Sequence, residues 1–368
     1  PVNVIRLEGF VNGKKKILYI FGDHHYEPNN QEECEEISAI DIHKYLYKFI
    51  KEYNGDNNYD IFIEDEKNIF TENKYEGYYK EKKRYLGQMR KLLSRFVDIK
   101  KNKNKVKINS KYNNFRFHYM DIRDYIAITK KNEKLYDLYL GNNGLLSFIE
   151  NMKLMMKNYD YIDMLENSKT LLYFLLILRD NYKKKNRLFI KLKKSYKHAK
   201  IKKKINDMLK KLFNFLNLCI SHLDKFLKEL LSINEKREVQ TIKKNYELII
   251  KFNDIIKVSF DIINKLPDLY FLRRFLDKKY TEYNILYTGS YHMRNLILIL
   301  VTEFDFKITH LSKSEKNVKD INKLILKEKY EIDKDILNYN NILKKYGKIL
   351  KIYDNQCSDI TDFPENFT

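Results

Sequence analysis

The feature that most constrains the fold is a short run of almost uninterrupted apolar residues, Ile17–Phe21, near the start of the sequence. Strands that are apolar on both faces are typical of the middle of an α/β sheet, where helices cover both sides. A second β-rich run precedes it, and the Asn12-Gly13 pair between the two runs is the usual signal of a two-residue hairpin turn. The sequence therefore predicts an α/β protein whose sheet contains this hairpin.

Further segments extend the α/β pattern. Four more runs have the length and composition of strands, at 59–64, 116–121, 284–288 and 306–310. Segments 34–53 and 294–301 read as helices, and strand–helix–strand order is typical of parallel sheets. We therefore expect a central, mostly parallel sheet with flanking helices.

The long stretch between the runs at 116–121 and 284–288 has few turn signals and reads as helical. In 211–231 the apolar residues recur at spacings of three and four, as in an amphipathic helix. The stretches 145–178, 187–209 and 239–263 also read as helical. We predict a large all-helical insertion in the α/β core. The expected division is 1–140 for the first part of the core, 141–265 for the basic helical insertion, 266–311 for the second part of the core, and 312–368 for C-terminal helices with an acidic tail.

The charge of the chain is strongly positive and unevenly distributed. The formal net charge is +21, and residues 181–211 hold 14 Lys and Arg against the single acidic residue Asp207. Such a segment attracts polyanions, so we expect nucleic acid, an acidic membrane face or acidic proteins as partners. A solvated helix face is the alternative. Because no helix-turn-helix, RNA-recognition or zinc-finger signature is visible, any nucleic-acid binding would be non-specific and electrostatic.

The cysteines and the apolar runs bear on the expected compartment. Cys34, Cys219 and Cys357 are odd in number and far apart, without a C-x-x-C pair, which is typical of a reducing compartment. The apolar run 171–178 is too short to span a bilayer, and the start of the sequence lacks the features of a signal peptide. We expect a protein that is not secreted and has no transmembrane segment.

Polar residues cluster directly after the predicted strands. They are His25, Glu64, Asp121, Arg123 and His292. Ligands of open α/β sheets bind outside the carboxyl ends of the strands, so these side chains are candidates for one pocket. Each also has a structural interpretation: a satisfied structural histidine, a helix cap, or an arginine in a buried ion pair.

Two of these turns share the form Gly-x-x-His, at Gly22–His25 and Gly289–His292. Glycine lets the chain turn sharply after a strand, and the histidine three residues later can then face the crevice. Two imidazoles and a carboxylate from separate strands can hold a divalent metal and leave one position for water. The neighbouring His24 makes the first ligand ambiguous, although the register favours His25.

The order of these motifs resembles the TraB/TIKI and erythromycin-esterase/ChaN-like superfamily. Within it the phrases FGDHH, RFHYMDIRD, DLYFLRRF and ILYTGSYH are most similar to proteins of large nucleocytoplasmic DNA viruses. The resemblance covers mainly 16–125 and 266–311, and it implies an α/β core with helical insertions in a protein of the virion or the host cytoplasm. An arginine that the family often carries before the second Gly-x-x-His has no clear counterpart here.

The resemblance also implies a site. His25, Glu64 and His292 match the family's polar set, with Asp121 and Arg123 beside them. They imply a hydrolase that holds Zn, Mn or Co through the first three residues, with Asp121 or the nearby Glu66 taking a proton from bound water and Arg123 holding an anionic group. The alternative is a catalytically inactive structural protein of the virion or capsid, whose basic helices hold nucleic acid, membrane or acidic partners.

Overall fold

The computed structural model describes residues 1–24, 34, 39–64, 87–89, 96–100, 105–108, 110–123, 161–183, 186–235, 242–277, 281–327, 336–351 and 357–368. The chain divides into two compact units. Unit 1 consists of residues 1–121 and 278–368, and unit 2 of residues 122–277.

Unit 1 is built on a six-stranded sheet with the order β6-β3-β7-β2-β1-β8. The strands are β1 (Asn3–Val11), β2 (Lys14–Asp23), β3 (Tyr59–Ile63), β6 (Phe115–Tyr119), β7 (Tyr283–Gly289) and β8 (Lys307–Leu311). The pairs β6–β3, β3–β7 and β7–β2 are parallel, whereas β1 is antiparallel to both β2 and β8. The protein is thus an α/β protein with a mixed sheet. The strand–helix–strand order of the last two strands does not make them neighbours, because β8 pairs with β1.

The hairpin between β1 and β2 forms at the predicted turn. Val11 pairs with Lys14, and the two residues between them, Asn12 and Gly13, have φ angles of 51° and 76°. Two successive residues with positive φ suit the right-handed twist of the flanking strands, and Asn-Gly tolerates that conformation best. The hairpin places β1 beside β2 and leaves the other edge of β2 for β7.

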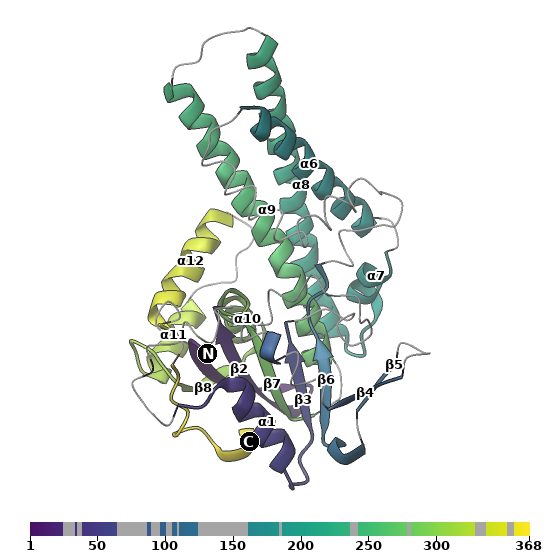
Figure 1. Ribbon diagram of the computed structural model, residues 1–368, viewed down its shortest axis with the longest axis vertical. Coiled ribbons are helices and arrows are strands. Elements are labelled where there is room, and N and C mark those ends of the chain that lie inside the picture. The colour runs from purple at the N-terminus through teal and green to yellow at the C-terminus, as the bar shows by residue number, and fades with distance from the viewer. Residues whose placement is uncertain are drawn as a thin grey trace. The chain divides into compact units, whose positions relative to one another are not determined.

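Helices cover the two faces of this sheet, as Figure 1 shows. On one face, α1 (Ile42–Glu52) packs with the C-terminal segment 357–368 in an apolar core. Its buried members include Tyr19, Phe21, Ile42, Leu46, Ile50, Ile61, Ile63 and Phe367. On the other face, α10 (Ser290–Phe304) lies so close to β2 that a Cβ at Gly22 would collide with the sulfur of Met293. Unit 1 also contains α11 (Val318–Lys327), α12 (Ile336–Ile349), the small sheet of β4 (Val97–Lys100) and β5 (Lys105–Ile108), and the 3₁₀ turns Ser110–Tyr112 and Glu365–Phe367.

The described elements of unit 2 are helices: α6 (Tyr161–Lys183), α7 (Arg187–Lys194), α8 (Ala199–Glu235) and α9 (Ile242–Asp277). Aromatic pairs hold them together, with Tyr182 of α6 stacked 3.6 Å from Phe213 of α8 and Phe226 of α8 stacked 5.2 Å from Phe252 of α9. The expected boundary between residues 265 and 266 falls inside α9. The expected boundary at 140 lies outside the described residues.

The segment 187–209, which was predicted to be helical, belongs to two helices, because the chain turns between α7 and α8. Arg273 of α9 donates to the carbonyl oxygen of Ser195 at 3.0–3.2 Å. The carboxylate of Asp277 accepts from the backbone N–H groups of Lys197 and His198, each at 2.9 Å. Asp277 of α9 thus satisfies backbone N–H groups just before α8, and these hydrogen bonds hold the turn between α7 and α8 in place.

The cysteine pattern predicts a reducing compartment, and the structure pairs two of the three cysteines. Cys34 and Cys357 form a disulfide, with their Cα atoms 5.5 Å apart, within the range that the bond requires. Cys219 is a buried free thiol. The partners are 323 residues apart, so their pairing depends on the tertiary fold and leaves no spacing signal in the sequence.

Candidate active site

The two Gly-x-x-His turns begin at the same edge of the sheet. β2 and β7 are parallel neighbours, and Asp23 at the end of β2 lies opposite Gly289 at the end of β7. The strand β3 flanks β7 on its other side and runs in the same direction. The ends of three parallel strands therefore meet at one carboxyl edge, where open α/β sheets bind their ligands.

Glu64 is the residue that follows β3, and the end of β7 holds it in place. Its backbone N–H donates to the carbonyl oxygen of Tyr287 at 3.0 Å. Its Oε2 atom accepts from the backbone N–H of Gly289 at 2.6 Å and from the hydroxyl of Thr288 at 3.0 Å. Gly289 is the N-cap of α10 and has no side chain with which to cap the helix. The carboxylate of Glu64 therefore serves as a capping acceptor at the positive end of the helix dipole.

His292 lies in the first turn of α10 and contacts the other oxygen of the same carboxylate. Its Nε2 atom is 3.2 Å from Oε1 of Glu64, and the exposed fractions of the two side chains are 4% and 6%. A carboxylate that contacts one ring nitrogen fixes the orientation of an imidazole and stabilises its protonated form. The structure thus brings together two residues that are far apart in the sequence and were expected to share a pocket.

A second polar pair lies beside the first at the same edge. His24 follows β2 directly and Ser290 is the first residue of α10, and Nδ1 of His24 is 3.4 Å from Oγ of Ser290. Both side chains are half-buried, whereas Asp23 next to them is buried. Sequence reasoning missed Ser290. Its signal was its position between an apolar strand and an apolar helix, where a side chain stands at the sheet edge.

The other predicted site residues have different positions. His25 and Glu66 lie outside the described residues. Asp121 follows β6 and is 9% exposed. Arg123 belongs to unit 2, where its Nη1 atom donates to Oδ1 of Asn264 at 2.6 Å. Of the five predicted site residues, the structure pairs Glu64 with His292.

A separate polar cluster accounts for His118 of the RFHYMDIRD motif. The carboxylate of Asp60 accepts two hydrogen bonds from Arg116 at 2.9 Å, lies 2.6 Å from Nε2 of His118 and accepts from Thr281 Oγ1 at 3.0 Å. Burial alone would raise the pKa of Asp60, but the hydrogen bond and charge of His118, together with Arg116, hold it below its usual value. Asp60 is the second residue of β3 and precedes Glu64 by four positions, so this cluster ties β3 to β6 within the sheet and is not part of the carboxyl edge.

The donors at the edge include the types that bind divalent metals. Within the described ranges, however, no three side chains of His, Cys, Asp or Glu converge as a metal site. Both oxygens of Glu64 already have partners in this structure. A metal bound by Glu64 and His292 would have to replace the contact between them.

The chain is similar over its whole length to proteins of a giant virus. Two proteins of Acanthamoeba polyphaga mimivirus, "Uncharacterized protein R161" and "Uncharacterized protein R706", are each 29% identical over 100% of this chain and over 97% and 96% of their own lengths. A third protein of that virus, "Uncharacterized protein R129", is 37% identical over 34% of this chain. These relatives support the link to giant viruses that the sequence motifs predict.

No solved structure matches the chain. In the part of the chain that the structure describes, no helix is both long and apolar enough to cross a membrane. One family matches from residue 1 to residue 368. The chain therefore belongs to that family, which is described as a family of unknown function (DUF5847).

Proposed function

We propose that this protein is a hydrolase whose reaction takes place at the carboxyl edge of β2, β3 and β7. The observation that carries the proposal is the buried Glu64–His292 pair, held by the backbone N–H of Gly289 and the hydroxyl of Thr288. Burying an ionisable pair is costly unless its hydrogen bonds are satisfied, and such pairs in sheet-edge pockets are often catalytic. The resemblance to the TraB/TIKI and erythromycin-esterase/ChaN-like superfamily supports the same reaction class.

In this proposal Glu64 is a positioning residue and His292 moves the proton. The carboxylate orients the imidazole and stabilises its positive charge when His292 takes a proton from the attacking water. His24 and Ser290 are half-buried, so in this proposal they contact the substrate, and the positive end of the α10 dipole favours developing negative charge.

A divalent metal is an alternative form of the proposal, in which His292 is a ligand and not the group that takes the proton. Zn, Mn or Co would be held by Glu64 and His292, with His25 as the third ligand that the resemblance supplies. When bound, such an ion lowers the pKa of a coordinated water. Glu64 and His292 would each contact the ion in place of their contact with one another. Glu64 would keep its bonds to Gly289 and Thr288, which hold Oε2.

Elemental analysis of protein purified without chelator tests the metal. We expect a stoichiometric divalent metal in the parent and loss of that metal in the His25→Ala/His292→Ala double variant. Equal metal content in the two proteins would remove the ion from the proposal, and hydrolysis would then depend on the Glu64–His292 pair alone.

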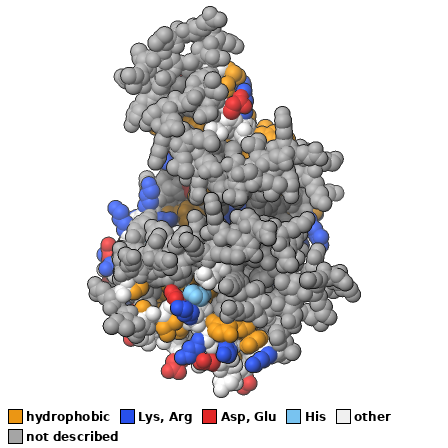
Figure 2. Space-filling view, viewed as in Figure 1, with side chains coloured by type: hydrophobic (Ala, Val, Ile, Leu, Met, Phe, Trp, Pro, Cys, Tyr) orange, Lys and Arg blue, Asp and Glu red, His pale blue; other side chains and the backbone are white. Residues whose placement is uncertain are grey.

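A second candidate function rests on the surface of α7 and α8. Six lysines there are exposed: Lys194, Lys197, Lys200, Lys202, Lys203 and Lys210. Near the lower end of the face in Figure 2, by contrast, the described Lys and Arg side chains lie among Asp and Glu side chains. Asp207 is the one acidic residue within 194–210, and such a surplus of positive charge suits non-specific contact with the phosphates of nucleic acid. A structural protein of the virion or host cytoplasm could use this surface without catalysis.

Binding of labelled duplex DNA at several salt concentrations tests this second function. Removing two charges from α8 with Lys200→Gln/Lys203→Gln should lower the slope of log affinity against log salt by about two. Lys48→Gln/Lys51→Gln on α1 removes the same charge from exposed positions and should leave the slope unchanged. Equal effects of the two pairs, or an affinity independent of salt, would contradict a binding surface on α8.

A further inference from the structure

A cavity of about 150 Å³ lies in unit 1 where the C-terminal segment 357–368 crosses the sheet beside α1. Its lining comes from β1, β2, α1 and this segment: Val4, Tyr19, Tyr45, Ile360, Thr361, Phe363, Pro364, Glu365 and Phe367. None of these residues belongs to the Glu64–His292 site. The cavity is therefore a second place where a ligand could be held, and it is independent of the proposed hydrolase reaction.

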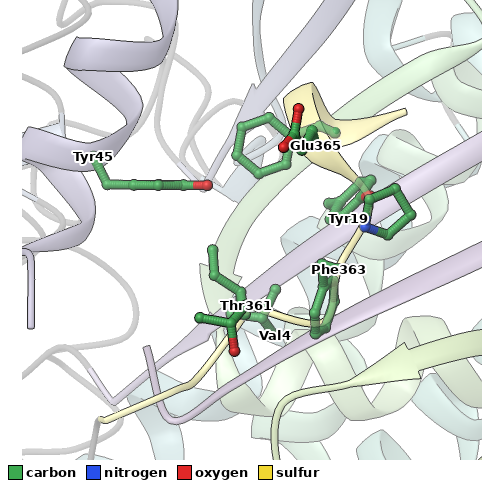
Figure 3. Close-up of a pocket in the computed structure, with 9 residues that line it drawn as sticks. Val4, Tyr19, Tyr45, Thr361, Phe363 and Glu365 are labelled. Atoms are coloured by element: carbon green, nitrogen blue, oxygen red, sulfur yellow. The ribbon is translucent and has the colours of Figure 1, made fainter.

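Four aromatic rings form much of the wall. Phe367 packs edge-to-face on Tyr19 at 5.1 Å and on Tyr45 at 5.8 Å, and Phe363 lies 6.0 Å from Tyr19. Figure 3 shows Tyr45 reaching in from one side, with Tyr19 and Phe363 on the other. Burial raises the pKa of Tyr19 to about 12, and burial also raises the pKa of Tyr45, so both rings stay neutral at physiological pH. The face of a neutral aromatic ring is negative and attracts a cation that lies over it.

The charge at this place is opposite to that of the whole chain. Residues 357–368 contain Asp359, Asp362 and Glu365 and no Lys or Arg, although the formal net charge of the protein is +21. Glu365 lines the cavity and is exposed, so its carboxylate stands at the mouth.

One cation already lies near the wall and is fully engaged. Arg6 is 5.6 Å from the centre of the Tyr19 ring, is ion-paired with Glu8, and donates to the carbonyl oxygen of Thr368 at 2.8 and 3.0 Å. Its charge is therefore balanced within the protein. Arg6 thus already lies over the Tyr19 ring at cation–π distance.

We propose that this cavity binds a methylated ammonium group, as found in choline or in a trimethylated lysine side chain. Aromatic faces attract such a cation electrostatically, and its methyl groups make it easier to remove from water than a bare ammonium. The carboxylate of Glu365 supplies the opposite charge. A purely apolar ligand would gain from the rings but would gain nothing from the carboxylate of Glu365.

Calorimetric titration with choline chloride tests the proposal, and its neutral isostere 3,3-dimethyl-1-butanol is the matched ligand. We expect choline to bind about tenfold more tightly than the alcohol, as a desolvated cation–π site implies. A trimethyllysine peptide and its unmodified counterpart form a second arm, which separates a protein-borne cation from a free one. Equal binding of choline and the alcohol, or binding of no methylated cation, would overturn the proposal.

Variants of the wall and the mouth locate the site. Glu365→Gln removes the charge at an exposed position where folding is not at risk, and it should weaken choline binding by about threefold or more. Tyr45→Leu keeps an apolar side chain but removes a ring, and should weaken binding further. The control Glu52→Gln removes an exposed carboxylate from α1 outside the cavity and should have no effect. Unchanged affinity in both Glu365→Gln and Tyr45→Leu would show that choline binds elsewhere and overturn the assignment.

Discussion

Glu64 connects three parts of the candidate active site through one carboxylate. Its backbone continues β3, its Oε2 atom is bound by the last residues of β7, and its Oε1 atom contacts His292 of α10. Hydrogen bonds to both oxygens stabilise a buried carboxylate. Removing the carboxylate would leave each of those donors buried without an acceptor. The same residue therefore contributes to both folding and the proposed chemistry.

Replacing this carboxylate by an amide separates the two contributions. Glu64→Gln offers one acceptor oxygen and turns its N–H groups toward a donor, so we expect the free energy of unfolding to fall by about 1–3 kcal/mol. Urea unfolding measures this loss. Glu52→Gln, an exposed change of the same type, should change the free energy of unfolding by less than about 0.5 kcal/mol. If Glu64→Gln were equally neutral, the hydrogen bonds to Glu64 would not be present in solution.

A buried lysine of unit 2 makes stability depend on pH. Lys265 of α9 is 1% exposed, and burial lowers its pKa from 10.5 to about 8, although Asp261 and Asp268 favour its charged form. Between these two values the unfolded chain binds more protons than the folded one, so the free energy of unfolding rises with pH from about 8 toward 10.5.

Comparison with Lys265→Gln isolates that contribution, because glutamine keeps hydrogen-bond donors but does not titrate. We expect the free energy of unfolding of the parent, relative to this variant, to increase by up to about 3 kcal/mol as pH rises through that window. Denaturant unfolding at pH 7, 8, 9 and 10 follows it. A constant difference between the two proteins would mean that Lys265 keeps its usual pKa.

At the scale of elements, the C-terminal segment completes unit 1. Phe367 packs edge-to-face on Tyr19, Phe21, Tyr45 and Phe49, and the carbonyl oxygen of Asn366 accepts from Tyr59 at 2.6 Å. This short segment packs beside α1 on the same face of the sheet. It also carries one end of the disulfide.

The disulfide should therefore stabilise the docked segment. Reducing Cys34–Cys357 should lower the free energy of unfolding by about 2–5 kcal/mol, because a cross-link across a long stretch of chain restricts the unfolded state. Urea unfolding with and without dithiothreitol measures the change. The double variant Cys34→Ser/Cys357→Ser should match the reduced parent and show no further response to the reductant. A parent insensitive to dithiothreitol would contradict a stabilising disulfide.

At the scale of the whole molecule, the two compact units should differ in stability. Unit 1 is organised around a sheet and the described part of unit 2 around packed helices, so their unfolding enthalpies arise from separate cores. We expect differential scanning calorimetry to resolve two transitions. Glu64→Gln should shift one of them and Lys265→Gln the other. A single transition that both variants shift equally would show that the units unfold as one.

The sequence predicted local elements better than their arrangement. The Asn12-Gly13 turn, the buried run Ile17–Phe21 and the strand before Glu64 have local signals, and each forms as expected. The place of β8 beside β1 and the Cys34–Cys357 pair depend on contacts between distant residues, which no local pattern encodes.

In the candidate site, too, local signals predicted where some residues lie, whereas contacts between distant residues were not predicted. Glu64 and His292 were placed together because both follow strands of one sheet, and that rule needs only the strand order to be right. Arg123 was placed with them by its spacing after β6, but its partner Asn264 belongs to unit 2. Ser290 was missed because a single serine at a helix start is common.

The central claim is that Glu64 and His292 perform hydrolysis, and the rate of hydrolysis of nitrophenyl esters and fluorogenic peptides by matched variants tests it most directly. The account predicts turnover by the parent, a loss of about 100-fold or more in His292→Ala, and an unchanged rate in His222→Ala, which alters an exposed histidine of α8. Full activity in His292→Ala, or no turnover above the uncatalysed rate by the parent on any of these substrates, would contradict it.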